Sequence, residues 1–311
     1  MEKQATREAY GQALAALGAE REDVVVLDAD LSKSTKTSTF QKDFPERFFD
    51  MGIAEQNLLG VAAGFAAAGK VPFASTFAVF ATGRAYDQIR NSICYPHLNV
   101  KIAATHAGIT VGEDGGSHQA LEDINLMRGL PNMTVLVPAD GPEAYKAIMA
   151  AAEYDGPVYI RLGRSAVPTI TDPNKDFVIG KGSVLREGTD VTLVACGMMV
   201  AVALDAAALL ADEGVSAAVI DMSTVKPIDR ALISEWAQKT GAMVTAEEHN
   251  IIGGLGSAVA EVLVADKPVP LEMVGIEDTF GESGPAGELV EKYGLTKEHI
   301  AEKAKRAIAR K

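Results

Sequence analysis

Short runs of β-branched and other apolar residues alternate with helically spaced segments along the first half of the chain. The runs predict strands at residues 23–30, 71–76, 99–106, 133–139 and 157–163. Apolar side chains at i, i+3 and i+4 predict helices at residues 55–69, 84–94 and 141–154. Alternation of strands and helices predicts a mostly parallel sheet with helices on both faces.

A second set of alternating elements follows a stretch with little periodicity. Residues 167–183 contain two prolines and two threonines, which predicts a linker. Beyond it, a helix is expected at residues 200–214, and strands at residues 190–197, 216–227, 242–249 and 271–278. The fold class is therefore α/β, with two doubly wound domains at residues 1–166 and, smaller, at residues 184–311.

Composition narrows the classes of partner. The chain has 311 residues, of which 48% are hydrophobic and 23% charged, as in an ordinary globular protein with ample core. Its net charge of −13 would repel polyanions, so neither nucleic acid nor an anionic membrane surface is expected as a partner. Anionic small molecules stay possible, because a few local arginines can outweigh a distant surface charge.

Cysteine spacing and the N-terminal sequence add two expectations. The two cysteines, Cys94 and Cys196, form no CxxC or Cys/His pattern, so neither a disulfide framework nor structural zinc is expected. The first ten residues, "MEKQATREAY", lack the apolar region of a signal peptide, and no apolar run reaches about 18 residues. A cytoplasmic protein is the natural expectation.

Polar clusters stand at the ends of the predicted strands. In doubly wound sheets, ligands bind beyond the carboxyl ends of the strands. The clusters there read "DADLSKS", "STFAVF", "THAGITVGEDGGSHQ", "RLGRS" and "EEHNIIGGLG". Four of the five belong to the first domain, so the chemistry is expected mostly in that domain.

The segment "THAGITVGEDGGSHQ" is the least ordinary of these clusters. It places His106 and His118, two of the chain's five histidines, on either side of a glycine-rich loop. A helix cap would account for Asp114 or Ser117 alone, but not for both histidines. The pattern favours a functional site. No third ligand has convincing spacing, so a metal site is not predicted.

Three other features have ordinary explanations when they are taken one at a time. Phe77 and Phe80, three residues apart after a strand, could simply pack in the core. Arg164 could bind a phosphate bidentately, but a solvated arginine is the commoner case. Glu55 begins the alanine-rich segment, where the helix dipole alone favours an acid.

Taken together and in order, seven motifs resemble the pyrimidine-binding half of transketolase. They are "ATR", "DADLS", "GIAEQN", "STFAVF", "THAGITVGEDGGSHQ", "PNMTVLVPAD" and "RLGRS". The second unit resembles the C-terminal domain of the same family, so the resemblance covers nearly the whole chain. It implies a thiamine diphosphate-dependent enzyme that transfers a two-carbon ketol unit from a ketose phosphate to an aldose phosphate.

The resemblance also implies roles for residues at the cofactor. Glu55 would hydrogen-bond N1′ of the aminopyrimidine and so help the cofactor to lose its C2 proton. That task needs a carboxyl group that shares its proton readily in apolar surroundings. Phe77 and Phe80 would stack on the aminopyrimidine, and Asp30 and Leu31 would line the cofactor near its thiazolium.

The substrate residues follow by position in the same motifs. Those that would bond the sugar hydroxyls and the oxygen at the reacting carbon are His106, Asp114 and His118. Together with Glu55, the two histidines are the expected catalytic residues. Those that would hold the sugar phosphate are Arg7, Ser34 and Arg164. The chain departs from the family in two places. Gly83 stands where some relatives carry a third aromatic, and the loop reads Asp-Gly-Gly-Ser-His where Asp-Gly-Pro-Ser/Thr-His is commoner.

The family holds the cofactor's diphosphate through a divalent metal, Mg or Ca, on a separate domain with a Gly-Asp-Gly motif. The string "GDG" does not occur in this chain. The resemblance therefore implies the C-terminal subunit of a split transketolase. Its partner, an N-terminal subunit, would hold the metal, and the two would form an α2β2 heterotetramer acting on sugar phosphates.

Three alternatives remain at this point. The β-subunit of a 2-oxo acid dehydrogenase has the same layout but does not usually carry "GEDGGSHQ". A deoxyxylulose-phosphate synthase-like enzyme is suggested by "GRAYDQ", although that enzyme is normally one chain. A non-catalytic scaffolding homologue would have little reason to retain Glu55, His106 and His118 together.

Overall fold

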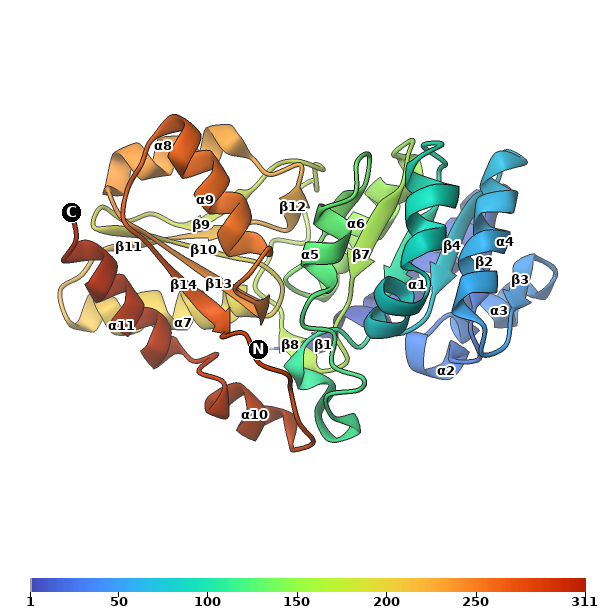
Figure 1. Ribbon diagram of the computed structural model, residues 1–311, viewed down its shortest axis with the longest axis horizontal. Helices are drawn as coiled ribbons and strands as arrows, with labels where there is room; N and C mark the ends of the chain where they lie inside the picture. The colour runs from blue at the N-terminus through green and yellow to red at the C-terminus, as the bar shows by residue number, and fades with distance from the viewer. Residues whose placement is uncertain (1) are drawn as a thin grey trace.

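In the computed structural model, which describes residues 2–311, a seven-stranded sheet forms the centre of the N-terminal unit (Figure 1). The strand order is β12-β6-β7-β5-β4-β2-β3, and all neighbours are parallel except β12 and β6. The strands are β2 (Val24–Asp28), β3 (Phe48–Asp50), β4 (Val71–Ser75), β5 (Lys101–Ala104), β6 (Thr134–Leu136), β7 (Val158–Arg161) and β12 (Thr224–Lys226).

Helices cover both faces of this sheet, as the alternation along the sequence predicted. They are α1 (Thr6–Glu20), α2 (Ser32–Thr35), α3 (Ser38–Asp43), α4 (Glu55–Ala67), α5 (Asp123–Arg128) and α6 (Gly141–Glu153). Strand β2 shows why its sequence is apolar throughout. Val24 and Val26 pack in the cluster that contains α1 and α6, whereas Val25 and Leu27 pack in the cluster that contains α4. A strand buried on both faces needs a continuous apolar run.

The C-terminal unit is a five-stranded sheet in the order β14-β13-β10-β11-β9, parallel except for β9. Its elements are β9 (Ser183–Arg186), β10 (Val191–Ala195), α7 (Met199–Asp212), β11 (Ala217–Asp221), α8 (Arg230–Thr240), β13 (Met243–Asn250), α9 (Leu255–Asp266), β14 (Leu271–Ile276), α10 (Ala286–Lys292) and α11 (Lys297–Ile308). Helices α8 and α9 cover one face, and α7 and α11 cover the other (Figure 1).

The two units share structure across their junction. Strand β12 follows β11 in the chain but pairs with β6, so it extends the sheet of the N-terminal unit. One apolar cluster runs through both units and includes Val135 of β6 and Val225 of β12. A small antiparallel pair, β1 (Lys3–Ala5) with β8 (Ala166–Pro168), lies beside the junction (Figure 1). Residues 169–182 contain neither helix nor strand.

Two predicted elements were wrong. The run at 216–227 is not one strand but two, because the chain bends after Asp221 and pairs its second part with the other sheet. The run is longer than a typical strand of about 5–6 residues, which is consistent with the break. The region 84–94 is not an α-helix. It begins at the last residue of one short π-helical segment, η2 (Phe80–Arg84), and most of it forms a second, η3 (Gln88–Cys94).

Several elements had no counterpart in the sequence-based prediction. They include α1 to α3, α5, α8, α10, α11, β1, β3, β8 and β9. Among residues 2–311, no helix combines the length and the apolar character needed to cross a membrane.

A buried ion pair joins β7 to α5 near the junction of the units. The Arg161 Nε donates to Asp123 Oδ2 at 2.7 Å, and the Tyr159 hydroxyl donates to the same oxygen at 2.6 Å. The Asp123 side chain is fully buried and that of Arg161 is 5% exposed. Burial alone would raise the pKa of Asp123, but the charge of Arg161 and these hydrogen bonds outweigh it, so its pKa is lowered.

Replacing Asp123 by asparagine should destabilise the fold by about 3–5 kcal/mol, because it removes the hydrogen-bonded carboxylate partner of the buried Arg161 guanidinium. Denaturant unfolding measures the change. The matched control is Glu153→Gln, which removes the exposed partner of Arg21 and should cost at most about 1 kcal/mol. Equal losses in the two variants would contradict the prediction.

Candidate active site at the carboxyl ends of the first sheet

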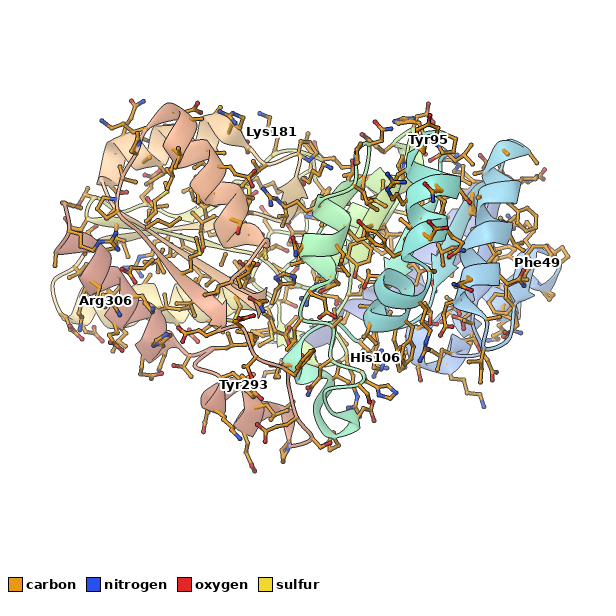
Figure 2. The ribbon with its side chains drawn as sticks, in the orientation of Figure 1. Phe49, Tyr95, His106, Lys181, Tyr293 and Arg306 are labelled. Atoms are coloured by element: carbon orange, nitrogen blue, oxygen red, sulfur yellow. The ribbon has the colours of Figure 1, made fainter. Side chains whose placement is uncertain are left out.

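The predicted site residues follow the carboxyl ends of neighbouring parallel strands. Asp30 follows β2, Phe77 follows β4, His106 follows β5 and Arg164 follows β7. Figure 2 shows His106 on the lower side of the N-terminal unit and Tyr293 on the lower side of the C-terminal unit. Asp30 and His106 have φ of +61° and +55°. Left-handed backbone is uncommon for residues other than glycine and is enriched at functional sites.

Four aromatic rings gather at this edge. The Phe77 and His106 rings stack with centroids 3.9 Å apart, and the Phe77 and Phe80 rings are 5.9 Å apart and nearly parallel. The His118 ring meets the Phe80 ring edge-on at 5.2 Å. The structure thus brings together both histidines and both phenylalanines that the sequence singled out. Phe77 is buried and Phe80 is half-buried, so the two rings form a wall that is partly open.

Arg7 connects this ring cluster to Ser34. Its Nη1 lies 2.9 Å from the Ser34 carbonyl oxygen and 3.4 Å from His106 Nε2. Because a guanidinium can only donate, His106 Nε2 must be an acceptor and its ring proton must be on Nδ1. That proton then faces the Thr105 Oγ1, which is 2.9 Å away.

His106 is held in its neutral form. Burial, followed by the positive charges of Arg7 and Arg164, lowers the pKa of His106 to about 3. Arg164 itself donates to the Val111 carbonyl and lies 3.3 Å from Glu113 Oε2, so it also ties down the glycine-rich loop. Two arginines face one neutral imidazole, which leaves a positive field suited to an anionic ligand.

Glu55 begins α4 and is buried, in agreement with the apolar surroundings that the family resemblance implied for it. Its Oε1 accepts a hydrogen bond from Arg84 Nη1 at 2.9 Å. The Arg84 guanidinium also lies over the Phe80 ring, 4.3 Å from its centroid. Arg84 is therefore the link between Glu55 and the ring cluster. Sequence analysis missed it, because an α-helical pattern at residues 84–94 does not predict that this side chain points toward Glu55.

The turn after β2 is held together by Asp28, a residue of the "DADLSKS" cluster for which sequence analysis predicted no role. The buried Asp28 carboxylate accepts from the Leu31 amide at 2.6 Å and from the hydroxyls of Thr35 and Thr37 at 2.7 and 2.9 Å. Burial raises the pKa of Asp28 to about 6. These bonds fix the backbone that presents the predicted residues Asp30 and Leu31.

Asp114 is the predicted residue that the structure leaves most separate. It is exposed at the end of η4 (Ile109–Asp114), and within residues 2–311 no other predicted site residue hydrogen-bonds to its side chain. No group of three or more His, Cys, Asp or Glu side chains in residues 2–311 is arranged to hold a metal ion.

Comparison with known proteins identifies both units. Residues 2–169 match the family described as "Transketolase, pyrimidine binding domain" and residues 180–300 match "Transketolase, C-terminal domain". A putative transketolase C-terminal section from Methanocaldococcus jannaschii is 51% identical over 300 residues, covering 96% of this chain and 94% of the relative.

Two further relatives cover the whole chain. A 6-deoxy-6-sulfo-D-fructose transketolase subunit from Clostridium sp. is 45% identical, over 100% of this chain and 97% of the relative. A solved structure described as a split-gene transketolase in an inactive β4 tetramer is 60% identical, with a TM-score of 0.92 and full coverage of both chains.

The His106 ring should stay neutral from pH 8 down to about pH 4, with its proton on Nδ1. Nitrogen NMR of the labelled ring measures both properties. Because the folded state binds this proton more weakly than the unfolded chain does, His106 should make stability rise with pH between about 3 and the ordinary value of 6.5. Arg7→Gln should raise the pKa of His106. A ring that titrates near 6.5 in the native protein would refute the assignment.

Proposed function

The chain belongs to the transketolase family, as the C-terminal subunit of a split enzyme, and we propose that it takes part in ketol transfer between sugar phosphates. In this proposal a two-carbon unit moves from a ketose phosphate to an aldose phosphate through thiamine diphosphate, the cofactor on which the family depends. The diphosphate and its divalent metal are held by a separate N-terminal subunit.

The contact between Arg84, Glu55 and Phe80 is the observation that carries the proposal. The guanidinium is a flat group that donates from its edge to the carboxylate and lies against the phenyl ring. An aminopyrimidine is likewise flat, and its edge can hydrogen-bond to a carboxyl group. The residues present therefore fit the ring end of thiamine diphosphate once the Arg84 side chain moves away from Glu55.

The cofactor supplies, when bound, the carbon centre that takes up and gives away the two-carbon unit. Glu55 holds the proton at N1′, in a position where burial keeps water from competing for the carboxyl group. Phe77 and Phe80 orient the ring by stacking, and the Asp30–Leu31 turn contacts the cofactor near its thiazolium. His106 and His118 bond the oxygen at the reacting carbon and the sugar hydroxyls, with Asp114 at the rim.

Arg7, Ser34 and Arg164 bind the anionic end of the sugar. The charges of both guanidiniums lower the pKa of His106, and Arg7 already reaches the turn that carries Ser34. An arginine fork suits phosphate and also the sulfonate for which the Clostridium relative is named. We infer that the substrate is a sugar with a terminal oxyanion and propose phosphate as that group.

The outward face of α4 supports a close contact with a partner subunit. Gly60 and Gly64 are exposed on this face, and a Cβ at either position would meet no heavy atom within 4 Å. An exposed glycine inside a helix costs about 1 kcal/mol relative to alanine, so two of them call for a reason such as close approach of another chain. Ile53, a large apolar side chain that is 79% exposed, lies two residues before the start of this helix.

Glu55→Gln should leave the fold and the assembly with the partner intact but lower turnover by about 10²–10⁴-fold, because glutamine cannot share a proton with N1′ as a carboxyl group does. Hydrogen–deuterium exchange at C2 of the bound cofactor should slow by a similar factor. The control is Glu46→Gln, at an exposed acid paired with Arg47 in the same unit, which should leave the exchange rate unchanged. Unchanged C2 exchange in Glu55→Gln would sink the assignment.

The chain alone should bind thiamine diphosphate weakly and show no ketol transfer. Titration with the N-terminal subunit should produce activity that requires metal and saturates at one chain of each kind, as expected for an α2β2 heterotetramer with two equivalent sites. The inactive β4 tetramer described for the solved relative supports this expectation. Tight cofactor binding with full turnover by the isolated chain would overturn the proposal.

A leucine on the α4 face gives this prediction a matched pair of variants. Gly64→Leu should fold, because the position has open space and leucine favours helix, but it should weaken activation by the partner at least about tenfold. Gly287→Leu, at another exposed helical glycine with open space in α10, should leave activation within about twofold. Equal activation of both variants would exclude α4 from the interface.

A further inference from the structure

The loop that carries Asp114 and His118 has little regular secondary structure to fix its conformation. Between residues 107 and 120, three glycines have φ between +76° and +84°, and the main regular element is the single 3-10 segment η4. Glycine in left-handed backbone has more alternative conformations than any other residue. One of those conformations must therefore be selected by contacts that span the loop or reach it from the C-terminal unit.

Glu248, at the end of β13 in the C-terminal unit, makes one such contact. Its Oε1 accepts a hydrogen bond from the Thr110 amide at 2.7 Å, 138 residues earlier in the chain. The carboxyl group packs so closely on Gly108 that a Cβ at that position would overlap it. Arg161 in turn donates to the Glu248 carbonyl at 2.9 Å, so the backbone at Glu248 is held in place as well.

Gln119 makes the second contact, at the other end of the loop. Its Nε2 lies 3.2 Å from the Ile109 carbonyl oxygen, 3.3 Å from that of Gly112 and 2.9 Å from that of Glu282. The side chain is 3% exposed. One buried amide thus joins the start of the loop, its middle and a segment of the C-terminal unit.

That segment, residues 279–285, packs backbone to backbone on the loop. A Cβ at Gly116 would lie 2.7 Å from the Gly281 carbonyl oxygen, and one at Gly115 would overlap Ser283. These approaches require glycine in the loop. They also account for the run "TFGESGP", to which the sequence-based assignment gave no role.

Apolar packing also reaches the loop, because Ile109 is fully buried in the apolar cluster of the C-terminal unit, but it leaves a gap behind Thr110. A cavity of about 270 Å³ lies there between the units, and its lining includes Thr6, Ala107, Thr110 and Glu248. Beside this cavity, the Glu248 carboxyl is the group that accepts the hydrogen bond of the Thr110 amide. Loss of that carboxyl would leave the Thr110 amide without a partner in a buried position, at a cost.

We propose that Glu248 and Gln119 are positioning residues that set the course of the substrate-binding loop, so that the C-terminal unit serves as the template for Asp114 and His118. The inference rests on the proposed function, because it takes these two residues as sugar ligands. It assigns no contact with substrate to Glu248 or Gln119 themselves. Their effect passes through the backbone of residues 107–120.

The test compares three variants in the complex with the N-terminal subunit. Glu248→Met keeps the length of the side chain but cannot accept a hydrogen bond, and Glu248→Gln keeps the acceptor. Glu272→Met removes another largely buried acid of the C-terminal unit, paired with Arg310 away from the loop. Two readouts apply to each: amide hydrogen exchange in residues 107–120, and KM against kcat for the sugar substrates.

Glu248→Met should speed exchange in the loop at least about tenfold and raise KM by about 10–100-fold, because misplacement by about 1 Å can cost 10²-fold. C2 exchange of the bound cofactor should stay within about twofold, since Glu55 is untouched. Glu248→Gln and Glu272→Met should keep wild-type loop exchange and KM. If Glu248→Met does not fold, Gln119→Leu removes the second contact and should give the same pattern.

Each contrary outcome is decisive. Unchanged loop exchange in both Glu248→Met and Gln119→Leu would overturn the inference, as would faster exchange without a rise in KM. A rise in KM with an equal loss of C2 exchange would show a general structural role instead. Failure of the wild-type complex to transfer any ketol unit would refute the proposed function, while loop exchange would still decide whether the C-terminal unit holds the loop.

Discussion

The buried guanidinium of Arg161 is the point at which the sheet, the loop and the C-terminal unit meet. It pairs with Asp123 at the start of α5, and its Nη2 donates to the carbonyls of Ala120 and Glu248. Two distant parts of the chain, residues 120–123 and Glu248, thus bind one side chain. A lysine could not replace it, because only the planar fork of arginine offers several donors in fixed directions. The cost of burying the charge is offset because Asp123 and two carbonyls surround it.

The clustering of the site could be predicted because it follows from topology. Parallel strands end at the same edge of a sheet, so the polar residues after β2, β4, β5 and β7 had to meet there. The individual contacts could not be predicted in this way. The stacking of Phe77 on His106 depends on rotamers and on the left-handed backbone at His106. Arg84 depends on the π-helical phase of η2, in which the wider turn changes the direction of the side chains after Phe80.

The fold was predictable where local pattern decides and unpredictable where pairing is non-local. The continuous apolar run of β2 indicates burial on both faces whatever its neighbours are. Strand β12 has no such signal. Its residues could have extended β11, and only their pairing with β6 places them in the other sheet. This exchange ties the units together, because moving one relative to the other would break a strand pairing and a shared apolar cluster.

The two ends of the proposed ligand channel differ in how they are held. At the ring end, Glu55, Phe77 and Phe80 belong to one unit, and Arg84 supplies the contacts that a flat ring would take over. At the sugar end, the loop depends on hydrogen-bond acceptors of the other unit, the buried Glu248 carboxylate and the Glu282 carbonyl. Side chains fixed by the fold lose little freedom when a ligand arrives, so more of the contact energy appears as binding. Rigid attachment of the C-terminal unit is therefore a condition for recognising the sugar, whereas the ring end needs only the first sheet and its helices.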